Sequence, residues 1–319
     1  MQPFAEWVID WVFFSSAVVA PLAAVAAVYY GFTGAPAWAA ACAIVAAVAT
    51  WGAYARFVAP WQLRVKRLKI APRRESPSEG APPAASRPPL KVVFFSDLHL
   101  GRFKRQDWAQ RIVEAVNAQS PDLVLIGGDF VGKTACCDIA DLLAPLRHLK
   151  ATRGVYAVLG NHDYGIPGPD HSDELIQLFP QLNIRLLRNE CVAIGDDVLL
   201  VGVDELWTGR DDLHGALASY RRAPNMRVIV LGHNPDLMLK LDGRRAPPLL
   251  RDAFFIFGHT HQGQIYIPLL PGLAIPIKSK FYRGLHHTPY GALYVSSGCG
   301  ENSTPTRINT WPEIVVFET

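Results

Sequence analysis

"LKVVFFSDLH", residues 90–99, joins a run of strand-forming residues to two polar side chains, Asp97 and His99. The valines and phenylalanines at 92–95 favour a buried β-strand. One aspartate after a strand is ordinary, because aspartate is a common turn residue. The stretch matters because the chain repeats its arrangement four more times.

Each of the other four apolar runs also ends in side chains that can bind metals. Asp129 follows "LVLIGG", Asn161, His162 and Asp163 follow "VYAVLG", His233 follows "RVIVLG", and His259 and His261 follow "FFIFG". Because ligands bind at the carboxyl ends of strands in α/β sheets, we expect these side chains to meet at one edge. Carboxylates, an amide oxygen and imidazoles suit divalent transition metals. A structural zinc site has four ligands. Without His162 and Asp163, two carboxylates, one amide oxygen and four imidazoles make seven candidates, and these favour two ions that share a bridging carboxylate.

The order of elements after residue 90 predicts the fold class. Strand runs alternate with helix patterns and are then followed by pairs of strands. This order predicts an α/β fold, a four-layer α/β/β/α sandwich over residues 90–319, with two mixed sheets between helices. Residues 61–89 precede it as a basic juxtamembrane segment and a proline-rich linker. Within that segment, residues 62–70 fit either an edge strand or a membrane-surface segment.

The first 60 residues have a different composition. Glu6, Asp10 and Arg56 are their only charged residues, and the stretches 11–30 and 37–55 carry no charge. A helix of about 20 apolar residues crosses a bilayer. We therefore expect a transmembrane helical hairpin over residues 1–60, with two buried helices of a soluble protein as the alternative. A cleaved signal peptide is disfavoured because the N-terminus is acidic.

Charges near the hairpin predict its orientation. Six arginines and lysines lie between residues 64 and 74, whereas the connection between the two apolar stretches has none. The positive-inside rule places the N-terminus and the C-terminal domain in the cytoplasm, and we expect a bacterial inner membrane. The basic cluster favours contact with membrane lipids. A net charge of +3 gives no reason to expect nucleic acid as a partner. The oligomeric state is left open.

The motif series resembles a known enzyme family. In order, "DLH", "GD", "GNHD", "GHNPD" and "GHTH" are similar to the motifs of the calcineurin-like metallophosphoesterases, over residues 90–319. The resemblance implies that one metal is held by Asp97, His99 and His261. It implies that the other is held by Asn161, His233 and His259, and that Asp129 bridges the two. The family often has a second aspartate where this chain has Gly132, which puts the support of a neighbouring loop in question.

The same resemblance implies phosphoester hydrolysis with two divalent ions, manganese first, and iron, zinc or magnesium as alternatives. Two cations about 3.5–4 Å apart bind the oxygens of a phosphodiester and lower the pKa of a shared water molecule. His162 would contact a phosphoryl oxygen or protonate the leaving group, and Asp163 would orient its ring. Arg102 and Arg283 are weaker candidates for substrate binding, with a solvated surface arginine as the alternative.

The residues that follow the last motif bear on the substrate class. An apolar segment follows the last motif, "IYIPLLPGLAIP" at residues 265–276. Such a segment can contact lipid or pack beneath a sheet. The membrane-anchored branch of the family includes enzymes that resemble UDP-2,3-diacylglucosamine hydrolases. We therefore expect a lipid-linked phosphodiester or pyrophosphate, with a membrane-tethered phosphodiesterase on soluble substrates as the alternative and a non-catalytic membrane scaffold as a remote one.

Overall fold

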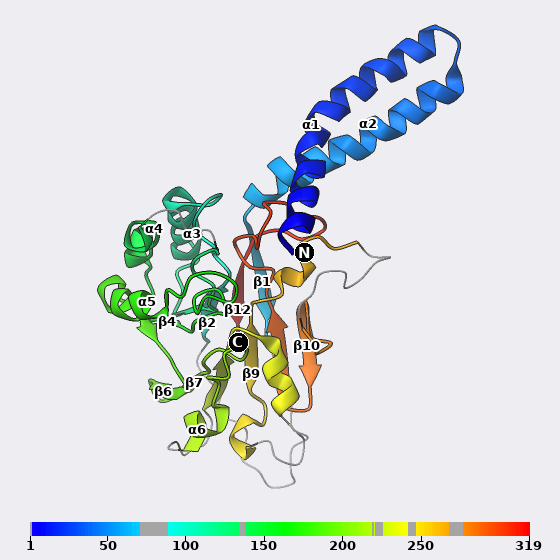
Figure 1. The fold of residues 1–319 in the computed structure, drawn as a ribbon. Helices are drawn as coiled ribbons and strands as arrows, with labels where there is room; N and C mark the ends of the chain where they lie inside the picture. Colours follow the sequence, from blue (N-terminus) through cyan, green and yellow to red (C-terminus); the bar gives the residue numbers. More distant parts are fainter. Residues whose placement is uncertain are drawn as a thin grey trace, which may run out of the picture.

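The structure is a computed structural model that describes residues 2–70, 89–133, 138–218, 220, 226–241, 247–267 and 277–319. A long helical hairpin projects from a two-sheet body, and the chain's C-terminus lies within that body (Figure 1). We call the two sheets and their covering helices the α/β body. The linker at 71–88 and most of the apolar segment at 265–276 lie outside the described residues.

The first sheet has six strands in the order β1-β12-β2-β3-β4-β5. Strands β2 to β5 are parallel to one another, β12 is antiparallel to β2, and β1 is parallel to β12. In that order, the bounds are Arg64–Lys69, Glu313–Glu318, Lys91–Phe95, Leu123–Ile126, Val155–Ala157 and Arg185–Leu186. The parallel strands β2, β3 and β4 therefore end at the same edge.

The second sheet also has six strands, in the order β10-β11-β9-β8-β7-β6. Strands β11, β9, β8 and β7 are parallel, and the outer strands β10 and β6 are antiparallel to their neighbours. In that order, the bounds are Gly284–Thr288, Gly291–Val295, Phe254–Phe257, Arg227–Leu231, Val198–Gly202 and Glu190–Ile194. Both sheets are mixed, as predicted.

Helices cover the outer face of each sheet. Over the first sheet lie α3 (Gln106–Asn117), α4 (Ile139–Leu143), α5 (Ser172–Leu178) and the 3-10 turns η2 (Ala144–His148) and η3 (Phe179–Leu182). Over the second lie α6 (Leu213–Ala218) and the turns η4 (Pro235–Lys240) and η5 (Pro248–Leu250). Three buried cores separate the four layers. The predicted α/β/β/α sandwich is confirmed.

Strand β2 shows how the sequence builds these layers. Successive side chains of a strand point to opposite faces. Val93 and Phe95 therefore pack in the core beneath the helices, while Val92 and Phe94 pack in the core between the sheets. Because both faces are buried, the strand is a continuous apolar run. Burial of this kind contributes about 25 cal/mol for each Å² of apolar surface removed from water.

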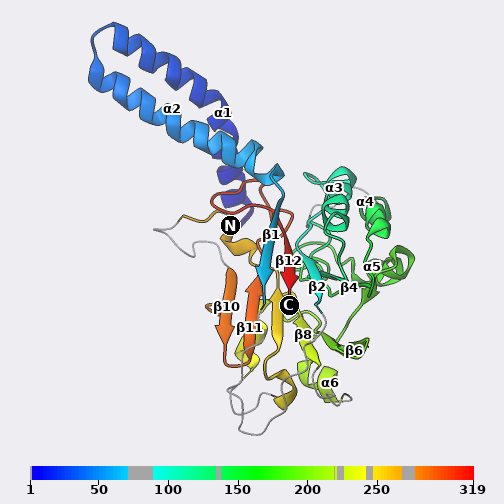
Figure 2. The ribbon, with the colours of Figure 1, turned by 180° about the vertical axis from the view of Figure 1, so that it is seen from behind.

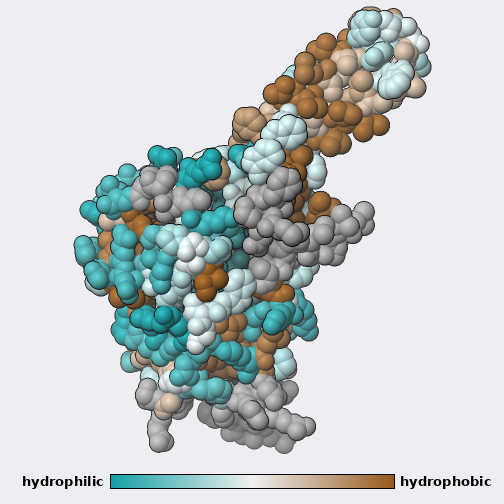
Figure 3. Space-filling view, viewed as in Figure 1, coloured by the Kyte–Doolittle hydropathy of each residue, from teal (hydrophilic) through white to brown (hydrophobic). Residues whose placement is uncertain are grey.

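The hairpin consists of α1 (Gln2–Phe32) and α2 (Pro36–Phe57), followed by the turn η1 (Ala59–Trp61). Two segments, Trp7–Phe32 and Pro36–Trp61, are long and apolar enough to cross a membrane. Their apolar side chains face outward along the hairpin, whereas hydrophilic side chains cover most of the visible α/β body (Figure 3). Arg56 and Asp10 join the two helices by an ion pair of 2.9 Å, which neutralises two of the few charges in this region.

Residues 64–69 form an edge strand rather than a membrane-surface segment. Strand β1 pairs with β12 along its whole length, just below the hairpin (Figure 2). The guanidinium of Arg64 stacks on the Trp311 ring at 3.6 Å, and Arg67 donates to the Gln119 side chain at 2.6 Å. The sandwich was expected to begin at residue 90. Strand β1 lies before that residue in the sequence and is nevertheless part of the first sheet.

Candidate metal centre

All seven predicted metal ligands lie at one edge of the sandwich. They follow the carboxyl ends of β2, β3 and β4 in the first sheet and of β8 and β9 in the second, and all are buried. Five of them adopt positive φ: Asp97 (52°), His99 (43°), Asp129 (56°), His259 (69°) and His261 (48°). Such angles are uncommon outside glycine and cluster at functional sites. The chain thus turns sharply after β2, β3 and β9, where these five residues lie.

Asp97, His99 and His261 form the first cluster of potential ligands. The Nε2 atoms of the two histidines lie 3.0 Å apart, and His261 Nε2 lies 3.6 Å from a carboxylate oxygen of Asp97. Two imidazole nitrogens that face each other this closely need a shared proton or cation between them. The first cluster therefore has the donor set for one metal ion.

Asn161, His233 and His259 form the second cluster. The amide oxygen of Asn161 lies 2.8 Å from His259 Nδ1 and 3.1 Å from His233 Nε2. The other ring nitrogen of His233, Nδ1, lies 2.7 Å from the carbonyl oxygen of Gly127. That carbonyl can only accept, so Nδ1 carries a proton and the second nitrogen faces the cluster. A backbone partner of this kind fixes the tautomer of a metal-binding histidine.

Asp129 lies between the two clusters. Its Oδ2 atom is 3.4 Å from His99 Nε2 and 3.3 Å from His233 Nε2. Its other oxygen accepts a hydrogen bond of 2.9 Å from the backbone N–H of His162, which fixes the carboxylate. One carboxylate oxygen thus faces a histidine of each cluster. This is the position that a bridging ligand needs.

Charge at the centre fits bound cations. Burial lowers the pKa of His99 to about 3 and lowers the pKa values of His259 and His261 well below the usual range. These rings are therefore neutral at neutral pH, which is the metal-binding form. Burial also opposes a charge on His233, but the carboxylate of Asp129 outweighs it and raises the pKa of His233 to about 10. Beside Asp129, positive charge is favoured, and a divalent cation supplies it.

Two glycines allow the loops after β3 and β4 to cross at the centre. A Cβ on Gly160 would lie 2.1 Å from Asp129 Oδ1, and a Cβ on Gly128 would lie 2.6 Å from Gly160 N. Gly128 also has φ of +85°, which side chains disfavour. Only glycine at both positions lets Asp129 sit against the loop that carries Asn161.

Comparison with known proteins agrees with this geometry. Residues 90–263 match the family model of the calcineurin-like phosphoesterases. The chain belongs to this family. Members of the family bind a dinuclear metal centre, and the two clusters of this chain provide a candidate for it.

Three relatives show the range of the family. An "Uncharacterized metallophosphoesterase" of Helicobacter pylori (strain ATCC 700392 / 26695) is 33% identical over 70% of this chain and 58% of its own length. "Phosphodiesterase YaeI" of Escherichia coli (strain K12) is 29% identical, over 72% of this chain and 82% of its own. A "Transmembrane protein with metallophosphoesterase domain" of Bos taurus is 32% identical, over 75% and 54%. The phosphoesterase thus spans just over half the length of the first and third of these relatives.

The carboxylate of Asp163, expected to orient the His162 ring, contacts backbone groups in the structure. Its carboxylate accepts hydrogen bonds of 2.9 Å from the backbone N–H groups of Asp129, Phe130 and Gly160. A buried carboxylate needs such donors, and these donors leave it directed at the backbone instead of at the His162 ring. Asp163 therefore holds the loop after β3. Gly132, where the family often has a second aspartate, lies on this same loop.

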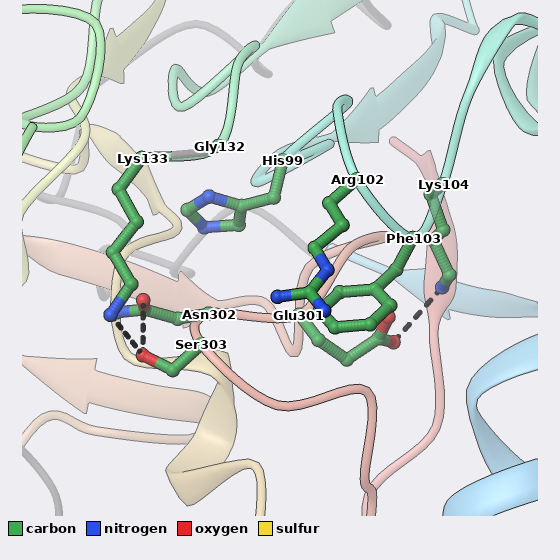
Figure 4. A pocket seen from close by; sticks show the side chains of 9 residues that line it. All are labelled: His99, Arg102, Phe103, Lys104, Gly132, Lys133, Glu301, Asn302 and Ser303. Carbon is green, nitrogen blue, oxygen red and sulfur yellow. Dashed lines mark hydrogen bonds and ion pairs between the residues drawn. The ribbon is translucent and has the colours of Figure 1, made fainter. Parts of the chain in front are cut away.

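His162 and the two candidate arginines lie at different distances from the clusters. The His162 ring packs edge-to-face on His99, with ring centroids 4.8 Å apart, and no described group hydrogen-bonds its Nδ1. Arg102 lines a pocket that His99 also lines (Figure 4). Arg283 stacks on the Tyr266 ring at 4.1 Å and does not line that pocket. The structure thus packs His162 against a predicted ligand, places Arg102 in the pocket that His99 lines, and leaves Arg283 outside this pocket.

Two residues at the site were missed by sequence reasoning. Trp207 packs edge-to-face on His259, with centroids 4.5 Å apart, and is 40% exposed. Glu205 is buried, and its Oε1 has no hydrogen-bond partner among the described residues. Both follow β7, which ends at the same edge as β8 and β9. The run "LLVGVDELW" (199–207) carried the signal, since it too is a strand followed by polar residues.

Proposed function

We propose that the chain is a binuclear metallophosphoesterase that hydrolyses phosphodiesters or pyrophosphates at a membrane surface. The observation that supports this most directly is the position of Asp129. One of its carboxylate oxygens lies within 3.4 Å of His99 and of His233, which belong to different clusters. A carboxylate shared in this way suits two ions rather than one.

We assign Asp97, His99 and His261 to one divalent ion, Asn161, His233 and His259 to the other, and Asp129 to both. Manganese is our first choice, with iron, zinc or magnesium as alternatives, because histidine, carboxylate and amide ligands accept all of these metals. When bound, the ions supply charge to neutralise phosphate oxygens and to lower the pKa of water. Histidines bind a metal as neutral rings, so they would leave most of that charge available to the substrate.

The ring and the backbone of His162 both contact candidate metal ligands. Its ring packs against His99, so it lies beside the first cluster, and its backbone N–H holds the bridging carboxylate. We propose that the His162 side chain contacts a phosphoryl oxygen or delivers a proton to the leaving group. Asp163 contributes indirectly, because it fixes the loop that carries Asp129.

We propose that the hairpin spans a bacterial inner membrane and keeps the α/β body in the cytoplasm. Support comes from its apolar outer surface and from relatives whose names include "Transmembrane protein". A site held beside a membrane suits a lipid-linked phosphodiester or pyrophosphate. A soluble phosphodiester substrate is the alternative, in which case the hairpin only localises the enzyme.

Hydrolysis of bis-p-nitrophenyl phosphate tests the proposal. The full-length protein, purified in detergent and stripped of metal, should be inactive and should regain activity with Mn²⁺. Asn161→Ala and His162→Ala should lower kcat/KM by at least about 100-fold, the effect expected when a group acting at the reacting centre is lost. Arg147→Gln, a change on the exposed turn η2, is the control. Equal rates in all variants with and without metal would support a non-catalytic scaffold instead.

A further inference from the structure

A pocket lies beside the first cluster of potential ligands, toward the turn η1 (Ala59–Trp61), which we call the hairpin root. Figure 4 shows Arg102 and Lys133 extending into it from different sides, with the His99 ring between them. It is lined by His99, Arg102, Phe103, Lys104, Gly132, Lys133, Glu301, Asn302 and Ser303. Because His99 belongs to both the pocket and the metal centre, a group in the pocket is an immediate neighbour of a group at the metals.

The charges of the pocket favour an anion. Its lining carries three cationic side chains, Arg102, Lys104 and Lys133, and one carboxylate, Glu301. Glu301 Oε1 accepts from Lys104 Nζ at 2.9 Å and also from Arg307 Nε at 2.8 Å. The single negative charge is thus shared between two buried cations. Positive charge therefore predominates in the lining of the pocket.

Lys133, Asn302 and Ser303 form what we call the rim of the pocket, and hydrogen bonds hold this rim in place. Lys133 Nζ donates to Ser303 Oγ at 2.9 Å, and Ser303 Oγ donates to the Asn302 side chain at 3.1 Å. Gln264 accepts from the backbone N–H of Asn302, and its own N–H donates to the carbonyl of His261, both at 2.9 Å. The rim is thereby tied to the turn that carries a candidate metal ligand. Its donors are preorganised, which reduces the entropy lost on binding.

We propose that this pocket binds a second phosphate group of the substrate, next to the phosphate held at the metals. This inference rests on the proposed function and narrows its substrate class to diphosphate diesters. The guanidinium of Arg102 offers two parallel donors to phosphate oxygens, and Lys133 adds a point charge. In the reaction, a water oxygen bonds to the phosphorus at the metals and the P–O–P bond breaks. The bridging oxygen leaves with the second phosphate and takes up a proton.

The position of the pocket indicates where the rest of the substrate lies. Lys104 Nζ, in the pocket wall, also donates to the carbonyl of Pro60 at 2.7 Å, and Pro60 belongs to the hairpin root. The group attached to the second phosphate therefore lies on the hairpin side of the metals. Lipid-linked diphosphates and soluble nucleotide diphosphates share this chemistry, so the test has to include both.

Three substrates separate the possibilities for the full-length protein in detergent with Mn²⁺. Bis-p-nitrophenyl phosphate has one phosphorus, UDP-glucose has two and is soluble, and CDP-diacylglycerol has two and is a lipid. The readout is kcat/KM of each variant divided by that of the parent, on each substrate. Arg102→Gln should lose at least about tenfold more on the diphosphates than on bis-p-nitrophenyl phosphate, since a charge-assisted hydrogen bond contributes about 1.5–3 kcal/mol. Arg147→Gln, outside the pocket, should show no such difference.

The outcomes are distinct. Faster parent hydrolysis of CDP-diacylglycerol than of UDP-glucose assigns the pocket to a lipid-linked diphosphate, and the reverse assigns it to a soluble one. An equal loss on all three substrates in Arg102→Gln, or a parent that cleaves only bis-p-nitrophenyl phosphate, overturns the inference and leaves the proposed function standing. A metal-loaded parent that cleaves none of the three refutes the proposed function itself.

Discussion

Replacing Glu301 by glutamine should lower the free energy of unfolding, because Glu301 is the anionic partner of two buried cations. Glu301 is 2% exposed at its side chain and is the shared partner of Lys104 and Arg307. Arg307 N donates to the carbonyl of Ala55 in α2, and Lys104 donates to Pro60. Glu301 and its two cationic partners thus lie close to the end of α2 and the turn η1.

The magnitude follows from the charges that remain. Glu301→Gln keeps the side-chain shape but leaves two buried cations without an anion. Removing one partner of a buried ion pair costs about 3–5 kcal/mol, so the midpoint of thermal unfolding should fall on the order of 10 °C for a body of this size. Lys104→Met should cost less, about 1–3 kcal/mol, because Glu301 keeps Arg307 as its partner.

A double variant provides the sharper test. In the Glu301→Gln background, Lys104→Met removes one of the two uncompensated cations. The free energy lost in the double variant should therefore be smaller than the sum of the two single losses by at least about 1 kcal/mol. Denaturant unfolding of the detergent-solubilised protein, followed by tryptophan fluorescence, measures all four free energies. Glu190→Gln is the control, because its pair with Arg185 is exposed and should contribute under about 1 kcal/mol. Strict additivity, or a Glu190→Gln effect as large as that of Glu301→Gln, would refute the reasoning.

Three further predictions concern the metal centre and pH. Gly160→Ala places a Cβ 2.1 Å from Asp129 Oδ1. The purified variant should therefore contain less metal than the parent when both are measured by mass spectrometry. Equal metal content would show that glycine is not required where the two loops cross. Burial lowers the pKa of Lys104 from 10.5 to about 8. Between these two values Lys104 binds more protons in the unfolded chain than in the folded one. The free energy of unfolding of the parent should therefore rise, relative to that of Lys104→Met, as pH rises through this window. A fall in this difference would contradict the prediction. In H₂¹⁸O, a single turnover should place the label in the phosphate product without a phosphoenzyme, and a trapped phosphoenzyme would exclude direct attack by water.

Most of the fold, and the gathering of the predicted ligands at one edge, could be predicted from local sequence. The continuous apolar run at 92–95 specifies a strand buried on both faces, and its core contacts agree. The ligand-bearing turns follow because parallel strands share a direction, so residues just past their ends meet. Arg283 was harder to place, because no local pattern says where a residue after a long loop will lie; the structure stacks it on Tyr266.

The sequence by itself determined which residues gather at the metal centre and that two apolar helices precede the α/β body, because strand period, apolar length and motif chemistry are properties of short stretches. Only the tertiary structure decided the role of Asp163, since its backbone partners include one 34 residues away. It also decided that Arg64–Lys69 is a strand paired with the chain's far end, and that Lys104 meets Glu301 across 197 positions. Such contacts depend on how layers pack, and a buried charge finds its partner only when the layers close.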